Sequence, residues 1–263
     1  MTGVARVPAR AARTGARGIG SIVLLAICLA GCGPNPDAAD LAIWRIVDHG
    51  CNATPATASG AQPQPARSST SGLQCDSAQG YAVLKDRCGT THFLLIPTAR
   101  RVGVESPELL SEQEPNYFER AWNERGRSLA ALPAPRHEDA DIGLAINSRY
   151  GRSQAQLHIH IDFVQPEVRA ALRGVSVAQG AAGTRLELMG HWYRVDHVDS
   201  LAQSPFTRVA GEWGARTEMD RARLTLAVVG DGGRGFFLLS DRADLLSLDR
   251  GHAEELLVPH SCG

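Results

Sequence analysis

"DIGLAINSRYGRSQAQLHIHIDFV", residues 141–164, is the stretch that decides the fold. Two apolar segments flank a short region that contains glycine, arginine and serine. This pattern is typical of two strands that pair as an antiparallel hairpin. Successive side chains of a strand point to opposite faces. In the second segment a leucine and two isoleucines therefore pack one way, and the other face carries His158, His160 and Asp162.

Further strands and helices are predicted on both sides of this hairpin. Residues 81–86 and 91–97 have the composition of strands, residues 184–198 that of two strands about Gly190, and "DGG" at 231–233 predicts a hairpin within 222–241. Helices are expected at 36–50, with Asp37 as the cap, from Pro115 to about 131, and within 204–216. The mixture indicates an α+β fold with a mainly antiparallel sheet, flanking helices and a C-terminal α+β extension from about residue 165.

The N-terminus has the pattern of an export signal. Four arginines precede "IGSIVLLAICLAGC", residues 19–32, whose apolar run is shorter than the roughly 20 residues that span a bilayer. "LAGC" resembles a bacterial lipobox, which predicts cleavage before Cys32 and lipidation of that cysteine. The alternative is an uncleaved N-terminal anchor. Both readings place the protein outside the cytoplasm, at a membrane surface.

Export affects how the cysteines are interpreted. Cys51, Cys75, Cys88 and Cys262 remain after the signal, an even number in an oxidising compartment. We expect them to form disulfides, among which a Cys51–Cys75 bridge would close the Ala-, Pro- and Ser-rich stretch 52–72. The sequence leaves three connectivities open. Because no CxxC spacing is present, a structural zinc site is not expected.

Charge excludes one class of partner. The chain contains 27 lysines and arginines against 28 acids, and loss of the four arginines in the signal leaves a net charge near −5. Proteins that bind nucleic acid gain affinity from clustered cations, and this sequence has no basic patch and no phosphate-binding glycine loop. Nucleic acid is therefore not an expected partner, whereas oligomeric state is not indicated.

Two histidines at i and i+2 of a strand have three ordinary explanations. They can be polar residues without chemistry. They can bind a metal, with His158, His160 and Asp162 as the ligand set. They can also act as nucleophile and partner in phosphoryl transfer. The spacing alone does not choose among these readings.

The surrounding motifs resemble the histidine triad (HIT) superfamily of nucleotide hydrolases and transferases. The resemblance rests on "THFLLIP" at 91–97, on Asn147 eleven positions before His158, and on Gln154 four positions before it. His158 then corresponds to the first histidine of the family motif and His160 to the central nucleophile. The sequence departs from the motif at Asp162, where the family has a third histidine, and at Ala155, where it often has serine or threonine.

An exported branch of that superfamily fits better. The N-terminal apolar segment, "YAVLKD", "FLLIPTAR", "ESPEL", "LAINSRYGRSQAQLHIHI" (144–161) and the final "H-x-C" together resemble the bacterial CDP-diacylglycerol pyrophosphatase family. The resemblance implies a HIT-like catalytic domain over residues 73–263, preceded by a helix and flexible linker at 32–72 and by the signal at 1–31. It also implies hydrolysis of CDP-diacylglycerol to phosphatidate and CMP, without a metal or other cofactor.

The site residues follow from this resemblance and from side-chain chemistry. We expect His160 to be the nucleophile and His158 to support it. Amide and guanidinium donors can stabilise charge on the pyrophosphate, and the candidates are Asn147, Gln154, Arg149 and Arg152. Six further histidines are expected to be structural or on the surface: His92, His137, His191, His197, His252 and His260. A metal-dependent hydrolase and a lipoprotein that only binds nucleotide or lipid stay as alternatives.

Overall fold

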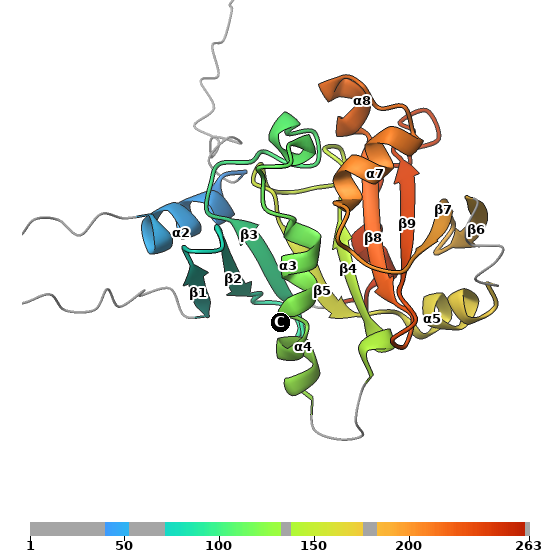
Figure 1. Cartoon of the computed structure of the whole chain (residues 1–263), viewed down its shortest axis with the longest axis horizontal. Helices are drawn as coiled ribbons and strands as arrows, with labels where there is room; N and C mark the ends of the chain where they lie inside the picture. The colour runs from blue at the N-terminus through green and yellow to red at the C-terminus, as the bar shows by residue number, and fades with distance from the viewer. Residues whose placement is uncertain (1–39, 53–71, 133–137, 176–182, 261–263) are drawn as a thin grey trace, which may run out of the picture. The chain divides into compact units, whose positions relative to one another are not determined.

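The computed structural model describes residues 40–52, 72–132, 138–175 and 183–260. Its centre is one antiparallel sheet whose strand order is β1-β2-β3-β5-β4-β8-β9-β7-β6 (Figure 1). The strands are β1 (Leu73–Asp76), β2 (Tyr81–Lys85), β3 (Phe93–Pro97), β4 (Ile142–Ile146), β5 (Ile159–Phe163), β6 (Thr184–Leu188), β7 (His191–Val198), β8 (Leu224–Gly230) and β9 (Phe236–Arg242). The predicted α+β class with a mainly antiparallel sheet is confirmed.

The decisive hairpin forms β4 and β5 at the centre of this sheet. Leu144 lies opposite Ile161, and Ala145 lies opposite His160. The connection is longer than a tight turn, because β5 begins only at Ile159 and residues 147–158 form an irregular excursion. This excursion contains Asn147 and most of the predicted substrate contacts.

The second half of the chain continues the same sheet. β8 pairs with β4, β9 with β8, and β7 with β9, all antiparallel. The predicted pairs β6–β7 and β8–β9 are both present, with Gly190 at φ +83 between the first two strands. The segment after residue 165 therefore extends the sheet of the first half with further strands and contributes helices around it. Its helices are α5 (Pro166–Arg173), α7 (Pro205–Glu212), α8 (Glu218–Ala222) and the 3-10 turn η3 (Ala253–Leu256).

Two helix predictions were wrong at their boundaries. The helix expected from Pro115 is split into α3 (Tyr117–Asn123) and α4 (Gly126–Ala130). The first of these begins at Tyr117, because Asn116 caps it by accepting a hydrogen bond from Glu119 N at 3.3 Å. The N-terminal helix α2 (Ala42–Cys51) starts after Leu41 rather than at a cap by Asp37, which lies outside the described residues. The 3-10 turns η1 (Pro107–Leu110) and η2 (Asp139–Asp141) complete the described helical elements.

The sheet is covered on both faces, which determines where a site can lie. On one face the largest hydrophobic cluster joins Leu157, Ile159 and Ile161 of the β5 region to side chains of α3 and α7. The opposite face holds two smaller clusters, one under α5 and η3 and one against α2. The histidine face of β5 lies between these two clusters, so it is buried without being apolar.

Several predictions concern residues outside the described part. The signal or anchor at 1–31, the lipobox Cys32 and almost all of the linker 52–72 belong to this group. Among the helices that the structure does describe, none is long and apolar enough to cross a membrane.

Candidate active site

The predicted histidines lie on the polar face of β5, together with Asp162, which lines a cavity. His158, His160 and Asp162 are 7%, 5% and 0% exposed, and their side chains share the face that the alternation predicted. The His158 and His160 rings contact each other edge-on, with centroids 4.9 Å apart. Buried polar groups need partners, and the contacts of each side chain define the site.

His160 is held by a histidine from the neighbouring strand. β3 pairs with β5 so that Leu94 lies opposite His160. His92, two residues earlier, therefore faces the same way, and its Nε2 lies 2.8 Å from His160 Nδ1. The other nitrogen of His160, Nε2, is buried without a hydrogen-bond partner and lies 3.4 Å from Glu254 Oε2.

Asp162 organises a third histidine. Its Oδ1 accepts hydrogen bonds from Thr91 Oγ1 at 2.6 Å and from Phe163 N at 2.7 Å, while its Oδ2 pairs with His260 Nε2. The His260 ring stacks on His92 at a centroid distance of 4.9 Å. The C-terminal segment runs beside the end of β5, where Val258 N donates a hydrogen bond to Phe163 O at 2.9 Å. This path brings His260 to Asp162.

Gly89 permits this approach of His260. Its φ is +80, and a Cβ at this position would lie 2.1 Å from His260 Nδ1. A side chain is therefore excluded both by the backbone conformation and by the histidine ring.

His158 is fixed by the backbone. Its Nδ1 lies 2.7 Å from the carbonyl oxygen of Gln156. Because a carbonyl only accepts, Nδ1 carries the hydrogen of the neutral ring. Gln156 is itself immobilised, since its Nε2 donates to Pro97 O and Ala99 O at 3.1 Å and its Oε1 accepts from Arg100 at 2.8 Å.

Glu254 approaches the histidines from η3 and is locked by Asn147. Asn147 Nδ2 donates to Glu254 Oε2 at 3.0 Å, and Glu254 N donates back to Asn147 Oδ1 at 3.0 Å. The predicted substrate contact Asn147 is thus part of the site, but both of its side-chain groups are engaged with Glu254.

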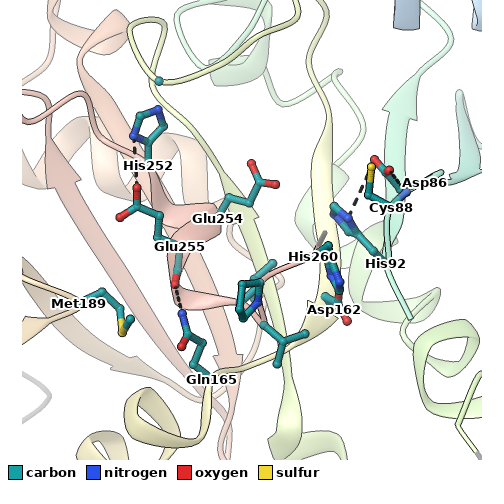
Figure 2. A pocket seen from close by; sticks show the side chains of 14 residues that line it. Asp86, Cys88, His92, Asp162, Gln165, Met189, His252, Glu254, Glu255 and His260 are labelled. Atoms are coloured by element: carbon teal, nitrogen blue, oxygen red, sulfur yellow. Dashed lines mark hydrogen bonds and ion pairs between the residues drawn. The ribbon is translucent and has the colours of Figure 1, made fainter. Parts of the chain in front are cut away.

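The cavity above these residues has a volume of about 630 Å³. Figure 2 shows His92, Asp162 and His260 along one wall and His252 and Glu255 along the other, with Glu254 between them. A cavity of this size admits a nucleotide-sized group.

Burial sets the protonation state of the histidines. Burial, followed by the neighbouring His158, His92 and His260, holds the pKa of His160 well below its usual value of 6.5. Burial also lowers the pKa of His158 and of His92, and the Asp86 carboxylate opposes the shift at His92. At neutral pH the three rings are uncharged, as nucleophilic imidazole requires.

The other predicted contacts lie farther from the histidines. Gln154 Oε1 accepts from Ile43 N of α2 at 3.1 Å. Arg152 makes two 2.6 Å bonds to the buried Glu105, although its charge still lowers the pKa of His158. Arg149 is exposed.

Sequence reasoning missed His92, His252, His260 and Glu254. The first three were expected to be structural or on the surface, but they line the cavity. His92 stands in the "THFLLIP" motif, and its role follows from the β3–β5 register. His260 belongs to the final "H-x-C" motif. Of the rest, His191 and His197 pair with Asp249 at 3.0 Å and Asp231 at 3.2 Å, and His137 lies outside the described residues.

The metal set considered from the sequence does not converge. Asp162 turns its oxygens to Thr91, Phe163 N and His260 rather than toward the other two histidines of the set. A different trio, His92, His160 and Glu254, brings one ligand atom each within 4.8 Å of one another.

Of the cysteines, Cys51 and Cys75 form a disulfide, as predicted. Cys88 lies on the cavity wall and is disulfide-bonded as well. Cys262 lies outside the described residues, so its pairing stays a prediction.

Comparison with known proteins agrees with the motifs. Residues 38–263 match the family model of CDP-diacylglycerol pyrophosphatase. A CDP-diacylglycerol pyrophosphatase of Yersinia pestis is 38% identical over 227 residues, which cover 84% of this chain and 83% of the relative.

Proposed function

This chain belongs to the CDP-diacylglycerol pyrophosphatase family, and from that membership we propose a two-step covalent hydrolysis carried by its buried histidines. The enzyme hydrolyses the pyrophosphate bond of CDP-diacylglycerol and releases phosphatidate and CMP. The observation that carries the mechanism is the His160 ring, of which Nδ1 is held by His92 whereas the buried Nε2 has no hydrogen-bond partner.

A consistent arrangement of protons leaves Nε2 of His160 free to attack. His160 Nδ1–H donates to His92 Nε2, and the proton of His92 then sits on Nδ1, 3.9 Å from Asp86 Oδ2. A carboxylate that faces a histidine stabilises this tautomer and the positive charge that develops on the ring during attack. Asp86, His92 and His160 thus form one chain of contacts.

In the first step, Nε2 of His160 attacks the phosphorus of the cytidylyl group. The bond from that phosphorus to the bridging oxygen breaks, phosphatidate leaves with the electron pair, and a cytidylyl-histidine remains. In the second step, water attacks the same phosphorus, the P–N bond breaks, and CMP leaves.

Glu254 is suited to the second step. Its Oε2 lies 3.4 Å from His160 Nε2 and is oriented by Asn147. A carboxylate in this place can accept the proton of the attacking water. Asn147 then positions the base. For Gln154, Arg149 and Arg152, the expected contacts with the pyrophosphate stay predictions, and Arg152 is the one whose charge acts on the histidines.

Membrane attachment is also part of the proposal. It is supported by the short apolar run before "LAGC", which predicts that Cys32 is the lipidated N-terminus of an exported protein. Mass spectrometry of protein extracted from membranes should find residues 1–31 removed and Cys32 acylated. An intact N-terminus or an unmodified Cys32 would reject lipidation.

Trapping the covalent intermediate tests the mechanism. With CDP-diacylglycerol labelled in the cytidylyl phosphate, rapid quenching at neutral or alkaline pH should recover label on the wild-type protein. His160→Ala should abolish both labelling and turnover, whereas His158→Ala should slow turnover and still become labelled. Exposed His49 offers a matched control, since His49→Ala should behave as wild type.

Two outcomes would change the assignment. Label on His160→Ala but not on His158→Ala would move the nucleophile to His158, whose Nδ1 is already fixed by Gln156. Near wild-type turnover by both variants, with folding retained, would remove the histidine mechanism.

The metal alternative is tested by chelation. Because His92, His160 and Glu254 present three ligand atoms together, a zinc-type site is chemically reasonable. The covalent mechanism predicts that EDTA leaves turnover largely intact. Complete loss that zinc restores would favour the metal mechanism.

A further inference from the structure

Three exposed leucines lie in one loop next to the candidate active site. Residues 244–249 connect β9 to the segment that enters η3. Leu246 and Leu248 are 98% and 86% exposed, and Leu245 is 50% exposed. Single exposed apolar residues are common, but adjacent ones mark a surface that contacts another apolar phase.

The loop is a hydrogen-bonded turn that presents these side chains. Asp244 O accepts from Ser247 N at 3.1 Å and from Asp249 N at 2.9 Å, while Asp244 Oδ1 accepts from Leu246 N at 3.1 Å. Leu248 adopts a φ of +65, a conformation that side chains rarely adopt. Because the turn satisfies these backbone groups itself, little further ordering is needed when the leucines leave water.

The loop leads directly into the wall of the cavity. Gly251 O accepts from Ser148 N at 2.9 Å, and His252 follows on the cavity wall. Arg250 directly follows the leucine turn, and Arg149 is next to Ser148, which bonds Gly251; both arginines are exposed. Apolar side chains flanked by cations suit the boundary of a membrane that contains anionic lipids.

We propose that the 244–249 loop inserts into the membrane surface, with its leucines among the acyl chains and the flanking arginines against lipid phosphates. The inference rests on the proposed function, because CDP-diacylglycerol keeps its acyl chains in the membrane and its pyrophosphate at the surface. Insertion beside the cavity brings that pyrophosphate to His160 without full extraction of the lipid.

The test compares two forms of the substrate. The full chain, reconstituted in vesicles of phosphatidylethanolamine and phosphatidylglycerol, is assayed with long-chain CDP-diacylglycerol in the bilayer and with a water-soluble short-chain analogue. Burial of each leucine is worth about tenfold in partitioning, so Leu246→Asp combined with Leu248→Asp should raise the apparent KM for the bilayer substrate by about 100-fold. The values for the soluble analogue should stay within about twofold of wild type.

Leu132 provides the matched control. It is 36% exposed and follows α4, which in Figure 1 lies at the end of the sheet opposite to α8 and the end of β9. Leu132→Asp should leave both assays unchanged. Equal effects of the loop and control substitutions on the bilayer substrate would overturn the proposal.

A second measurement does not depend on turnover. In Leu246→Trp, lipids with brominated acyl chains should quench more fluorescence than in the wild-type chain, which has its four native tryptophans. No added quenching would overturn membrane insertion. A change from dimer to monomer in the aspartate variant would instead assign the leucines to a contact between two copies. If wild-type protein hydrolyses neither substrate, the proposed function fails, while the quenching result still decides insertion.

Discussion

Three histidines of the candidate site differ in what holds each ring. His158 is tied to a backbone carbonyl, His160 to another imidazole, and His260 to the buried carboxylate of Asp162. Only His160 combines a held Nδ1 with a buried Nε2 that lacks a hydrogen-bond partner and approaches Glu254. The chemical difference between identical side chains therefore comes from their contacts.

Substitution of Glu254 should separate the two chemical steps. Glu254→Gln keeps the size and the contact with Asn147 but cannot accept a proton, so release of CMP should slow by about 100-fold or more, as general-base loss typically does. Formation of cytidylyl-histidine should continue. Rapid-quench kinetics should show labelled protein accumulating; a loss of labelling equal to the loss of turnover would contradict this role.

The acid limb of the reaction depends on the His160 pKa. In the proposed mechanism attack needs the neutral ring, and burial lowers the pKa of His160. Labelling should therefore persist below pH 6.5 and decline only as the pH approaches the lowered pKa. Single-turnover rates from pH 4.5 to 8 measure this limb. A midpoint at or above 6.5 would show that His160 does not control the step.

At the scale of elements, two segments far apart in sequence complete the site. β3 brings His92 beside β5 through its register, and the final segment brings His260 to Asp162 by running along the end of β5. The 147–158 excursion joins these parts to η3 through Asn147. The cavity is thus built at the meeting of β3, β5 and η3.

The disulfide between α2 and β1 should stabilise the fold without taking part in catalysis. Cys51 and Cys75 are 24 positions apart, and closing such a loop restricts the unfolded chain by about 3 kcal/mol. Replacing both by serine should lower the free energy of unfolding by about that amount in urea titrations. The kcat should change less than threefold, because neither cysteine lines the cavity. A large loss of kcat in folded protein would show that α2 controls the site through Gln154.

At the scale of the molecule, one continuous sheet carries both halves of the chain. β4 pairs with β5 on one side and with β8 on the other, so the predicted catalytic segment lies at the centre. Covering both faces buries the histidines, and the loss of water around them lowers their pKa values. The fold therefore favours neutral imidazoles at a cost in acid stability.

That cost predicts a pH-dependent stability. A histidine whose pKa is lowered in the fold takes up a proton more readily when unfolded, so the free energy of unfolding falls as pH drops below about 6.5. Asp241 has the opposite effect on stability. Burial raises its pKa to about 6, so its protonation as the pH falls through 6 favours the folded state. His160→Gln should make the slope shallower by up to about 1.4 kcal/mol per pH unit between pH 6.5 and 5.

Urea titrations across that range measure the slope. The exposed His49 supplies the control, since His49→Gln should leave the slope unchanged. A slope identical in His160→Gln and wild type would mean that the ring titrates alike in both states.

The sequence by itself determined the strands and the family. Apolar runs bounded by turn residues predicted β4, β5, β8 and β9. Alternation within β5 placed His158, His160 and Asp162 on one face, because a side chain's face depends on its position within a strand. The spacing of Asn147, Gln154 and the two histidines predicted the segment that carries the candidate site. Helix boundaries depend on local capping, and the cap at Asn116, rather than Pro115, decided where α3 begins.

Only the tertiary structure decided which distant residues complete the site. His92, Glu254 and His260 have no spacing in common with His160, and strand register and the path of the final segment bring them together. The tertiary structure also gave two predicted substrate contacts other partners: Arg152 pairs with Glu105, and Gln154 accepts a hydrogen bond from α2. The physical reason is that the sequence determines which side chains are present, whereas their partners, their burial and the resulting pKa values depend on three-dimensional neighbours.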